Sequence, residues 1–391
     1  MRACDVVLNL ADTTELNFNG QETAGLGPLS YEAQRGIYVH VTYAVTPHRE
    51  PLGVMDAWMW ARERKDSKGV RHGVKESTRW VEGYERVAEQ AAELPQTRQV
   101  YIADRESDIA ALMRRARDLG CPADWLIRAQ HNRVLPDGDR LWERVEASEP
   151  LGEIRFTLPG RDGCKAREVV QQVWASRIDV PDGEGGVMPV SCPIARELKA
   201  PADVTPLEWR LLTNREAADI AAVAQLIDWY RARWEVEIFF RVLKNGCRIE
   251  ALQLATIKRL EWALALFMVV AWRIARLMRL GRTCPVLDAE LMFESDERRA
   301  AFILNKQSPP DKAPRLNEVV WLVAKLGGFL ARKGDGEPGV KTIWQGLQRV
   351  MDFAAGIRYA REVDHLTCVY GMPWVPVIDH LTTHSGLEDC R

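Results

Sequence analysis

The chain has 391 residues, 47% of them hydrophobic and 28% charged, with a formal net charge of −2 and a pI of about 6.4. This is the composition of a globular protein with a large core and two or three domains. The near-neutral charge argues against a uniformly basic nucleic-acid-binding protein, so any such contact has to come from local clusters of cations.

The cysteines and the apolar segments give no sign of a zinc site or a membrane anchor. The eight cysteines form no C-x2-C pair and no Cys/His cluster with zinc spacing. Scattered cysteines without a signal peptide fit a reducing cytoplasm. The longest apolar run, residues 262–272, is too short to cross a bilayer and predicts a buried helix. We therefore expect a cytoplasmic protein without a membrane partner.

The first third of the chain predicts a mixed α/β domain. Residues 5–17, 37–46 and 54–60 are typical of three antiparallel strands with turn residues between them. A helix (75–94), a strand (99–103), a helix (107–119) and a strand (124–129) follow. Three strands, helix, strand, helix, strand is the order of an RNase H-like fold, in which metal-binding acids meet at one edge of the sheet.

Two acids fall at suitable places in that order. Asp12 lies within or at the end of the first strand, and Asp104 ends the fourth. Each also has an ordinary explanation: a strand-end turn for Asp12, and an N-terminal helix cap for Asp104. The pattern alone leaves both explanations open.

Residues 130–212 contain several Pro/Gly turn motifs with short apolar runs between them, which predicts an antiparallel β insertion. Beyond it, Thr213 and Glu216 form a capping-box pattern, so we expect a helix to begin near Thr213. No proline or glycine interrupts residues 216–245.

This predicted helix carries a stripe of cations around one carboxylate, Glu237. At about 100° per residue, the other members of the stripe fall within about 40° of Glu237; they are Tyr230, Arg233, Arg241, Lys244 and Arg248. One explanation is a solvated face with i,i+4 ion pairs, each contributing about 0.2–0.5 kcal/mol. The other is a surface that holds a phosphate chain beside a metal-binding acid.

The C-terminal third is predicted to be helical. A helix over residues 259–282 ends with Arg273, Arg276, Arg279 and Arg282, which either complement the helix dipole or contact DNA phosphates. Residues 307–314 predict a linker, and residues 317–330 and 341–359 predict two further helices. The stretch after about residue 362 matches no pattern.

The spacing Tyr230-x2-Arg233-x3-Glu237-x6-Lys244 resembles the Y-R-E-K signature of DDE transposases of the insertion-sequence family four, transposon-five type. Further similarity, over roughly residues 5–360, lies in these motifs: Asp12-Thr-Thr, Lys75-Glu-Ser-x-Arg79-Trp80, Asp104-Arg-Glu-Ser-Asp108-Ile, Trp125-Leu-Ile-Arg128, Trp209-x-Leu-Leu-Thr and Leu326-Gly-Gly-Phe329.

The resemblance implies an RNase H-like catalytic core with an antiparallel β insertion and a C-terminal α-helical module. The core would comprise residues 1–130 and 213–310, the insertion 131–212, and the dimerisation module and tail 311–391. Asp12, Asp104 and Glu237 would be the catalytic and metal-binding residues, with two Mg²⁺ (or Mn²⁺) ions per active site. The implied DNA-contacting residues are Tyr230, Arg233, Lys244, Trp209, Arg128, Arg241 and Arg248. Trp209 would stack beside a flipped base, and its alternative role is packing under the sheet.

The implied function is metal-dependent DNA cleavage and strand transfer by a homodimer on double-stranded DNA, namely transposon inverted-repeat ends and target DNA, in association with the bacterial nucleoid. The family places a DNA-recognition module before the first strand, whereas here the first acid is already residue 12. We therefore expect an N-terminally truncated chain. One alternative is a non-catalytic partner that dimerises with full-length transposase and inhibits it. A third hypothesis is an unrelated RNase H-like nuclease or resolvase, which would not need the cationic stripe.

Overall fold

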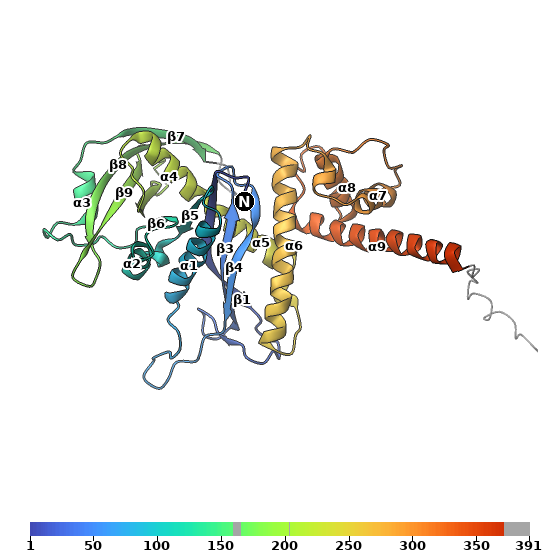
Figure 1. Ribbon diagram of the computed structural model, residues 1–391, viewed down its shortest axis with the longest axis horizontal. Helices are drawn as coiled ribbons and strands as arrows, with labels where there is room; N and C mark the ends of the chain where they lie inside the picture. Colours follow the sequence, from blue (N-terminus) through green and yellow to red (C-terminus); the bar gives the residue numbers. More distant parts are fainter. Residues whose placement is uncertain (159–165, 203, 371–391) are drawn as a thin grey trace, which may run out of the picture. The chain divides into compact units, whose positions relative to one another are not determined.

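The computed structural model describes residues 1–158, 166–202 and 204–370 (Figure 1). The chain forms two compact units, Met1–Leu280 and Gly281–Arg391. The unmatched stretch after about residue 362 lies, from residue 371 onward, outside the described residues. In the described part of the chain, no helix is both long and apolar enough to span a membrane.

The first unit is built on a mixed sheet whose described strands run in the order β2-β3-β1-β5-β6-β10-β9-β8-β7, with β4 paired to β3. β1 pairs with β5, and β5 with β6, in parallel, and the other pairs are antiparallel. The strands are β1 (Val6–Asn17), β2 (Gly27–Pro28), β3 (Arg35–Val45), β4 (Pro51–Trp60), β5 (Arg98–Ala103), β6 (Asp124–Arg128), β7 (Gly152–Leu158), β8 (Arg167–Pro181), β9 (Val187–Glu197) and β10 (Glu208–Thr213).

The helical segments of this unit follow most of the predicted order. They are α1 (Thr78–Glu93), η1 (Arg105–Ser107), α2 (Ala110–Asp118), α3 (Leu141–Glu146), α4 (Ile220–Ala232), α5 (Trp234–Arg241), a π-helical turn η2 (Val242–Gly246), η3 (Ile249–Ala251) and α6 (Ile257–Thr283). The predicted early strands and helices are all present within a few residues. The short helix α3 was not predicted. Its buried residues, Leu141 and Val145, form a single i,i+4 pair, which is too short a pattern to show helical periodicity.

Helices cover both faces of the central strands. Leu10 of β1 lies opposite Tyr43 of β3, and the Tyr43 ring stacks on Phe239 of α5 with ring centroids 4.6 Å apart. The next residue, Ala11, belongs to a buried cluster with Trp80 of α1. Successive strand residues point to opposite faces, so α5 covers one face and α1 the other, as Figure 1 shows. Asp12 therefore lies on the α5 face.

The segment predicted as a β insertion is antiparallel, and its strands continue the central sheet. β7, β8 and β9 pair in sequence, β9 pairs with β10, and β10 pairs with β6 of the core. The strands between residues 152 and 213 are thus hydrogen-bonded to the same sheet that carries Asp12. A sequence pattern gives strand positions but not which edge they join.

The predicted helix start at Thr213 is wrong. Thr213 is the last residue of β10, and its hydroxyl donates to the carbonyl of Trp125 at 2.6 Å. Helix α4 begins at Ile220, where the Asp219 carboxylate accepts from the Ala222 N–H at 2.8 Å. The capping-box pattern takes only neighbouring residues into account. It therefore could not show that Thr213 ends a strand and that its hydroxyl is bonded to the adjacent strand β6.

The second unit is helical, with η4 (Ala289–Leu291), α7 (Ser295–Leu304), α8 (Leu316–Leu326) and α9 (Val340–Tyr370). The predicted helices at 317–330 and 341–359 correspond to α8 and α9, whereas α7 was missed. α8 and α9 approach closely at two glycines. A Cβ on Gly346 would lie 1.7 Å from the carbonyl oxygen of Val323, and one on Gly327 would lie 1.8 Å from that of Thr342.

Candidate active site

Asp12 and Asp104 come from neighbouring parallel strands at the same level. Leu10 of β1 pairs with Ile102 of β5, and each aspartate follows two residues later, on the same face as its predecessor. Asp12 is buried, and its Oδ1 accepts the Thr13 N–H at 2.8 Å. Asp104 accepts the Glu106 N–H at 2.9 Å and caps η1. Asp104 therefore forms the helix cap that was considered for it as an alternative to metal binding, and it also lies next to Asp12.

The third predicted acid, Glu237, is linked to Asp12 through Arg233. Arg233 lies at the junction of α4 and α5. Its Nη1 is 2.6 Å from Oδ2 of Asp12, and its Nη2 is 3.6 Å from Oε1 of Glu237. The Arg233 and Asp12 side chains are 15% and 11% exposed, while that of Glu237 is 42% exposed. One guanidinium is thus shared by two of the three acids.

The electrostatics of Asp12 reflect this crowding. Burial raises the pKa of Asp12 to about 7, Arg233 opposes the rise, and the carboxylates of Asp104 and Glu237 add to it. Burial also raises the pKa of Tyr230, against the opposing influence of Arg233 and Arg128. The three acids, Arg233 and Tyr230 therefore act on one another as a single electrostatic cluster.

The donor set fits a hard divalent cation in kind, because carboxylate oxygens are the ligands that Mg²⁺ prefers. The guanidinium of Arg233 lies between Asp12 and Glu237 and contacts both carboxylates. However, among the residues that the structure describes, no three His, Cys, Asp or Glu side chains converge closely enough to form a metal-binding group. The acids influence one another electrostatically without closing around a common point.

The predicted single helical stripe is not continuous. The Arg233 N–H donates to the Tyr230 carbonyl and the Val236 N–H to the Arg233 carbonyl. Both hydrogen bonds join residue i to residue i−3, as in a 3₁₀ helix, so the helix is more tightly wound here. The π-helical turn η2 then widens it, with the Cys247 N–H bonded to the Val242 carbonyl. Uniform spacing of 100° per residue therefore fails on both sides of Glu237.

The predicted DNA-contacting residues of the stripe consequently have different surroundings. Tyr230 is buried, Lys244 is half-buried within η2, and Arg241 is exposed in the last turn of α5. Arg248 is exposed and lies after the helical segment in a left-handed conformation, with φ of 53°. Within this stripe, Arg233 interacts electrostatically with all three acids and Tyr230 with Asp104.

Trp209 is packed inside the protein, as its alternative role predicted. It is 8% exposed and stacks on Phe156 with ring centroids 5.7 Å apart. The Arg231 guanidinium lies 4.2 Å from the centroid of the same Phe156 ring. Phe156 thus occupies one face of the Trp209 ring, and the base contact of Trp209 stays a prediction.

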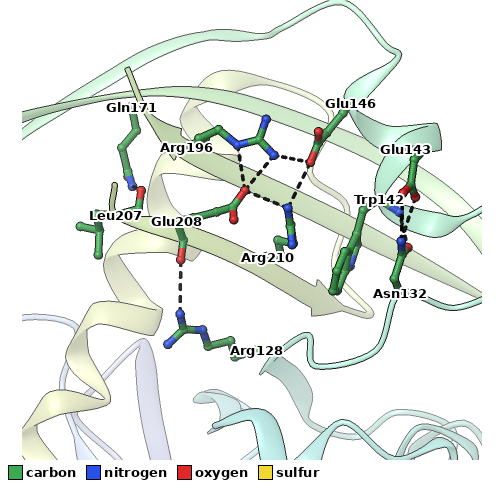
Figure 2. Close-up of polar contacts among 10 residues, drawn as sticks. All are labelled: Arg128, Asn132, Trp142, Glu143, Glu146, Gln171, Arg196, Leu207, Glu208 and Arg210. Carbon is green, nitrogen blue, oxygen red and sulfur yellow. Dashed lines mark hydrogen bonds and ion pairs between the residues drawn. The ribbon is translucent and has the colours of Figure 1, made fainter. Parts of the chain in front are cut away.

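Arg128 lies at the margin of an ion-pair network that was not predicted (Figure 2). Its Nη2 donates to the carbonyl of Glu208 at 3.3 Å. The Glu208 carboxylate binds Arg196 at 2.9 Å and Arg210 at 3.1 Å, and Arg196 also binds Glu146 of α3 at 2.6 Å. A clue was available, because Glu208 and Arg210 alternate along β10 and therefore share one face of the strand.

Asp108 is a second feature that sequence reasoning did not single out for a role. Its side chain is fully buried and pairs with Arg133 at 2.5 Å. It also accepts the N–H groups of Gln130 at 2.7 Å and His131 at 2.9 Å. These bonds tie the segment after Asp104 to the loop that follows β6. The second acid of the Asp104-Arg-Glu-Ser-Asp108 motif was the available signal.

A mixed sheet flanked by helices, with acids on two parallel neighbours and a later helix, is consistent with the RNase H-like class of polynucleotidyl transferases and nucleases. Residues 74–272, more than half of the chain, match the family model for the transposase DDE domain. The chain belongs to the DDE transposase family. Residues 269–366 match the transposase Tn5 dimerisation domain. Asp104 and Glu237 lie inside the first match, and Asp12 lies before it.

Proposed function

We propose that this chain cleaves DNA at transposon ends and joins those ends to target DNA, as a transposase of the insertion-sequence family four type with a Y-R-E-K signature. The observation that carries the proposal is the meeting of the α4–α5 junction with β1. There Arg233 contacts both Asp12 and Glu237, and Asp104 directly follows β5, the strand that pairs in parallel with β1.

Asp12, Asp104 and Glu237 would supply carboxylate oxygens to two Mg²⁺ (or Mn²⁺) ions. When bound, such a pair lowers the pKa of the attacking water or 3′-hydroxyl and stabilises the leaving oxygen. The protein side chains then mainly position the DNA and balance its charge. Packing of α5 against β1 and β3, through Phe239 and Tyr43, keeps the cluster partly sheltered from water.

The remaining residues would hold the DNA. Arg233 and Tyr230 would grip phosphates next to the cut, and Lys244, Arg241 and Arg248 would contact the backbone further away. Arg128 and Trp209 would assist at a base swung out of the helix. By resemblance, the reaction proceeds through nicking, attack of the 3′-hydroxyl on the opposite strand to form a hairpin, hairpin opening and joining to target DNA. We also propose the division into core (1–130 and 213–310), insertion (131–212) and dimerisation module with tail (311–391).

The test is Mg²⁺-dependent cleavage, by this protein, of DNA that contains the inverted repeats flanking the gene. Asp104→Ala is expected to abolish cleavage. Asp118→Ala, at an exposed position of α2, is the matched control and is expected to cleave normally. Cleavage that persists in Asp104→Ala would remove Asp104 from the metal site.

A second candidate is a non-catalytic role, in which the chain dimerises with an active transposase and inhibits it. The match of residues 269–366 to a dimerisation domain favours it. Titration of the chain into an active transposase of the same element tests this role. Undiminished cleavage at an excess of the chain would reject inhibition.

A further inference from the structure

Both carboxylate oxygens of Asp12 are already engaged by the protein. Oδ1 accepts the Thr13 N–H at 2.8 Å, and Oδ2 binds Nη1 of Arg233 at 2.6 Å. The ion pair is largely shielded from water, since neither side chain is more than 15% exposed. A hydrogen bond between charged and poorly hydrated groups is stronger than one on the surface. Arg233 therefore occupies one lone pair of Oδ2, and a metal ion at that oxygen would have to share it with a guanidinium of like charge.

Arg233 also engages the second acid that a metal would need. Its other terminal nitrogen, Nη2, lies 3.6 Å from Glu237, so the guanidinium spans an acid of β1 and an acid of α5. A divalent cation placed on the same two carboxylates would face the positive charge of Arg233 at close range. The arginine and the metal are therefore alternative partners of Asp12 and Glu237.

The chemistry of the guanidinium indicates where it can go instead. Its fork of N–H donors matches a phosphate as well as a carboxylate. A DNA phosphate beside the acids therefore offers Arg233 a replacement partner of the same charge. Its position at the tightened junction between α4 and α5 keeps the side chain within reach of the site.

We propose that Arg233 is a substrate-sensitive guard of the metal site, which releases Asp12 and Glu237 when it transfers to a DNA phosphate. This inference rests on the proposed function, because it takes those acids to be metal ligands. Binding of DNA and of metal is then coupled through one side chain. By linkage, each ligand strengthens binding of the other by the same factor.

Titration of the intact chain with Mn²⁺ alone, followed by the electron paramagnetic resonance signal of free Mn²⁺, tests the guard. Arg233→Gln is expected to bind Mn²⁺ about tenfold more tightly than the wild type, equivalent to about 1.4 kcal/mol. Arg231→Gln removes the same charge two residues away, where Arg231 faces Asp228 and Phe156 instead. It is expected to stay within about twofold of the wild type.

Two further variants keep the test decisive if Arg233→Gln folds poorly. Arg233→Lys retains the charge but has no fork to span both acids, so an intermediate affinity is expected. Asp12→Asn marks the site, and Mn²⁺ binding should be lost. Unchanged affinity in both Arg233 variants, with Mn²⁺ binding lost in Asp12→Asn, would overturn the guard and leave the metal site in place. Mn²⁺ binding that survives Asp12→Asn would overturn both.

The DNA arm repeats the titration with a short duplex of arbitrary sequence. The wild type is expected to bind Mn²⁺ more tightly with DNA than without it, and Arg233→Gln should lose most of that gain. An equal gain in the wild type and in Arg233→Gln would show that the coupling does not pass through Arg233.

Discussion

The close contact between α8 and α9 gives a sharp prediction for the second unit. A Cβ added at Gly346 would lie 1.7 Å from the carbonyl oxygen and 2.6 Å from the carbonyl carbon of Val323. Backbone atoms cannot rotate away, so the two helices have to separate by more than an ångström. Overpacking of this kind costs about 1–3 kcal/mol, and because the clash is with backbone we expect Gly346→Ala to destabilise the helix pair by about 2–3 kcal/mol.

The same helix provides the control. Gly356 of α9 is exposed, and a Cβ there meets nothing within 4 Å. Gly356→Ala should therefore stabilise α9 by about 0.5–1 kcal/mol, because alanine has less conformational freedom to lose. The two variants change the sequence identically and are expected to have opposite effects.

Hydrogen–deuterium exchange of the intact chain measures the effect locally. Amides of α8 and α9 should exchange about 30- to 150-fold faster in Gly346→Ala, as a loss of about 2–3 kcal/mol requires. In Gly356→Ala they should exchange no faster than in the wild type. Wild-type protection in Gly346→Ala, or an equal loss in both variants, would refute the close helix contact.

Two further predictions concern the first unit. Asp108→Asn leaves Arg133 without its buried partner and should destabilise the fold by about 3–5 kcal/mol in urea denaturation. Asp118→Asn, at an exposed site, should change the free energy of unfolding by no more than about 0.5 kcal/mol. Similar values for both variants would contradict a stabilising role of the buried Asp108–Arg133 ion pair. Burial, with a smaller contribution from Arg79, lowers the pKa of His40 to about 3, so the folded state binds fewer protons than the unfolded chain below pH 6.5. Stability from His40 is thus present above that pH and is lost as pH falls, by about 1.4 kcal/mol per pH unit. His40→Gln should reduce this slope in unfolding experiments between pH 6.5 and 5, and an unaltered slope would rule out the neutral buried imidazole.

The sequence pattern was sufficient to predict the central strands and the positions of Asp12 and Asp104 along the chain relative to them. Strict alternation places Asp12 on a defined face of its strand. Strands β1 and β4 both run antiparallel to β3, and α1 connects β4 to β5, so β5 runs parallel to β1. Parallel neighbours end at the same edge of a sheet, which brings Asp104 beside Asp12. These relations follow from local geometry, so they could be predicted without coordinates.

The helix that carries Glu237 could not be predicted in the same way. The tightening at Arg233 and the widening at η2 depend on packing against the sheet, and the residue letters contain no signal for either. The partner of Arg233 was likewise misjudged. Sequence spacing favours the i,i+4 neighbour Glu237, whereas the shorter contact is to Asp12, which lies far away in the sequence. Long-range partners of this kind require the fold.

We propose above that Asp12, Asp104 and Glu237 bind the same metal ions when DNA is present. The most direct measurement is anomalous scattering from Mn²⁺ in crystals of the chain with inverted-repeat DNA. Metal peaks are expected about 2.0–2.3 Å from carboxylate oxygens of all three residues, with Arg233 turned onto a phosphate. Mn²⁺ bound elsewhere, or bound here with Arg233 still on Asp12, would contradict this proposal.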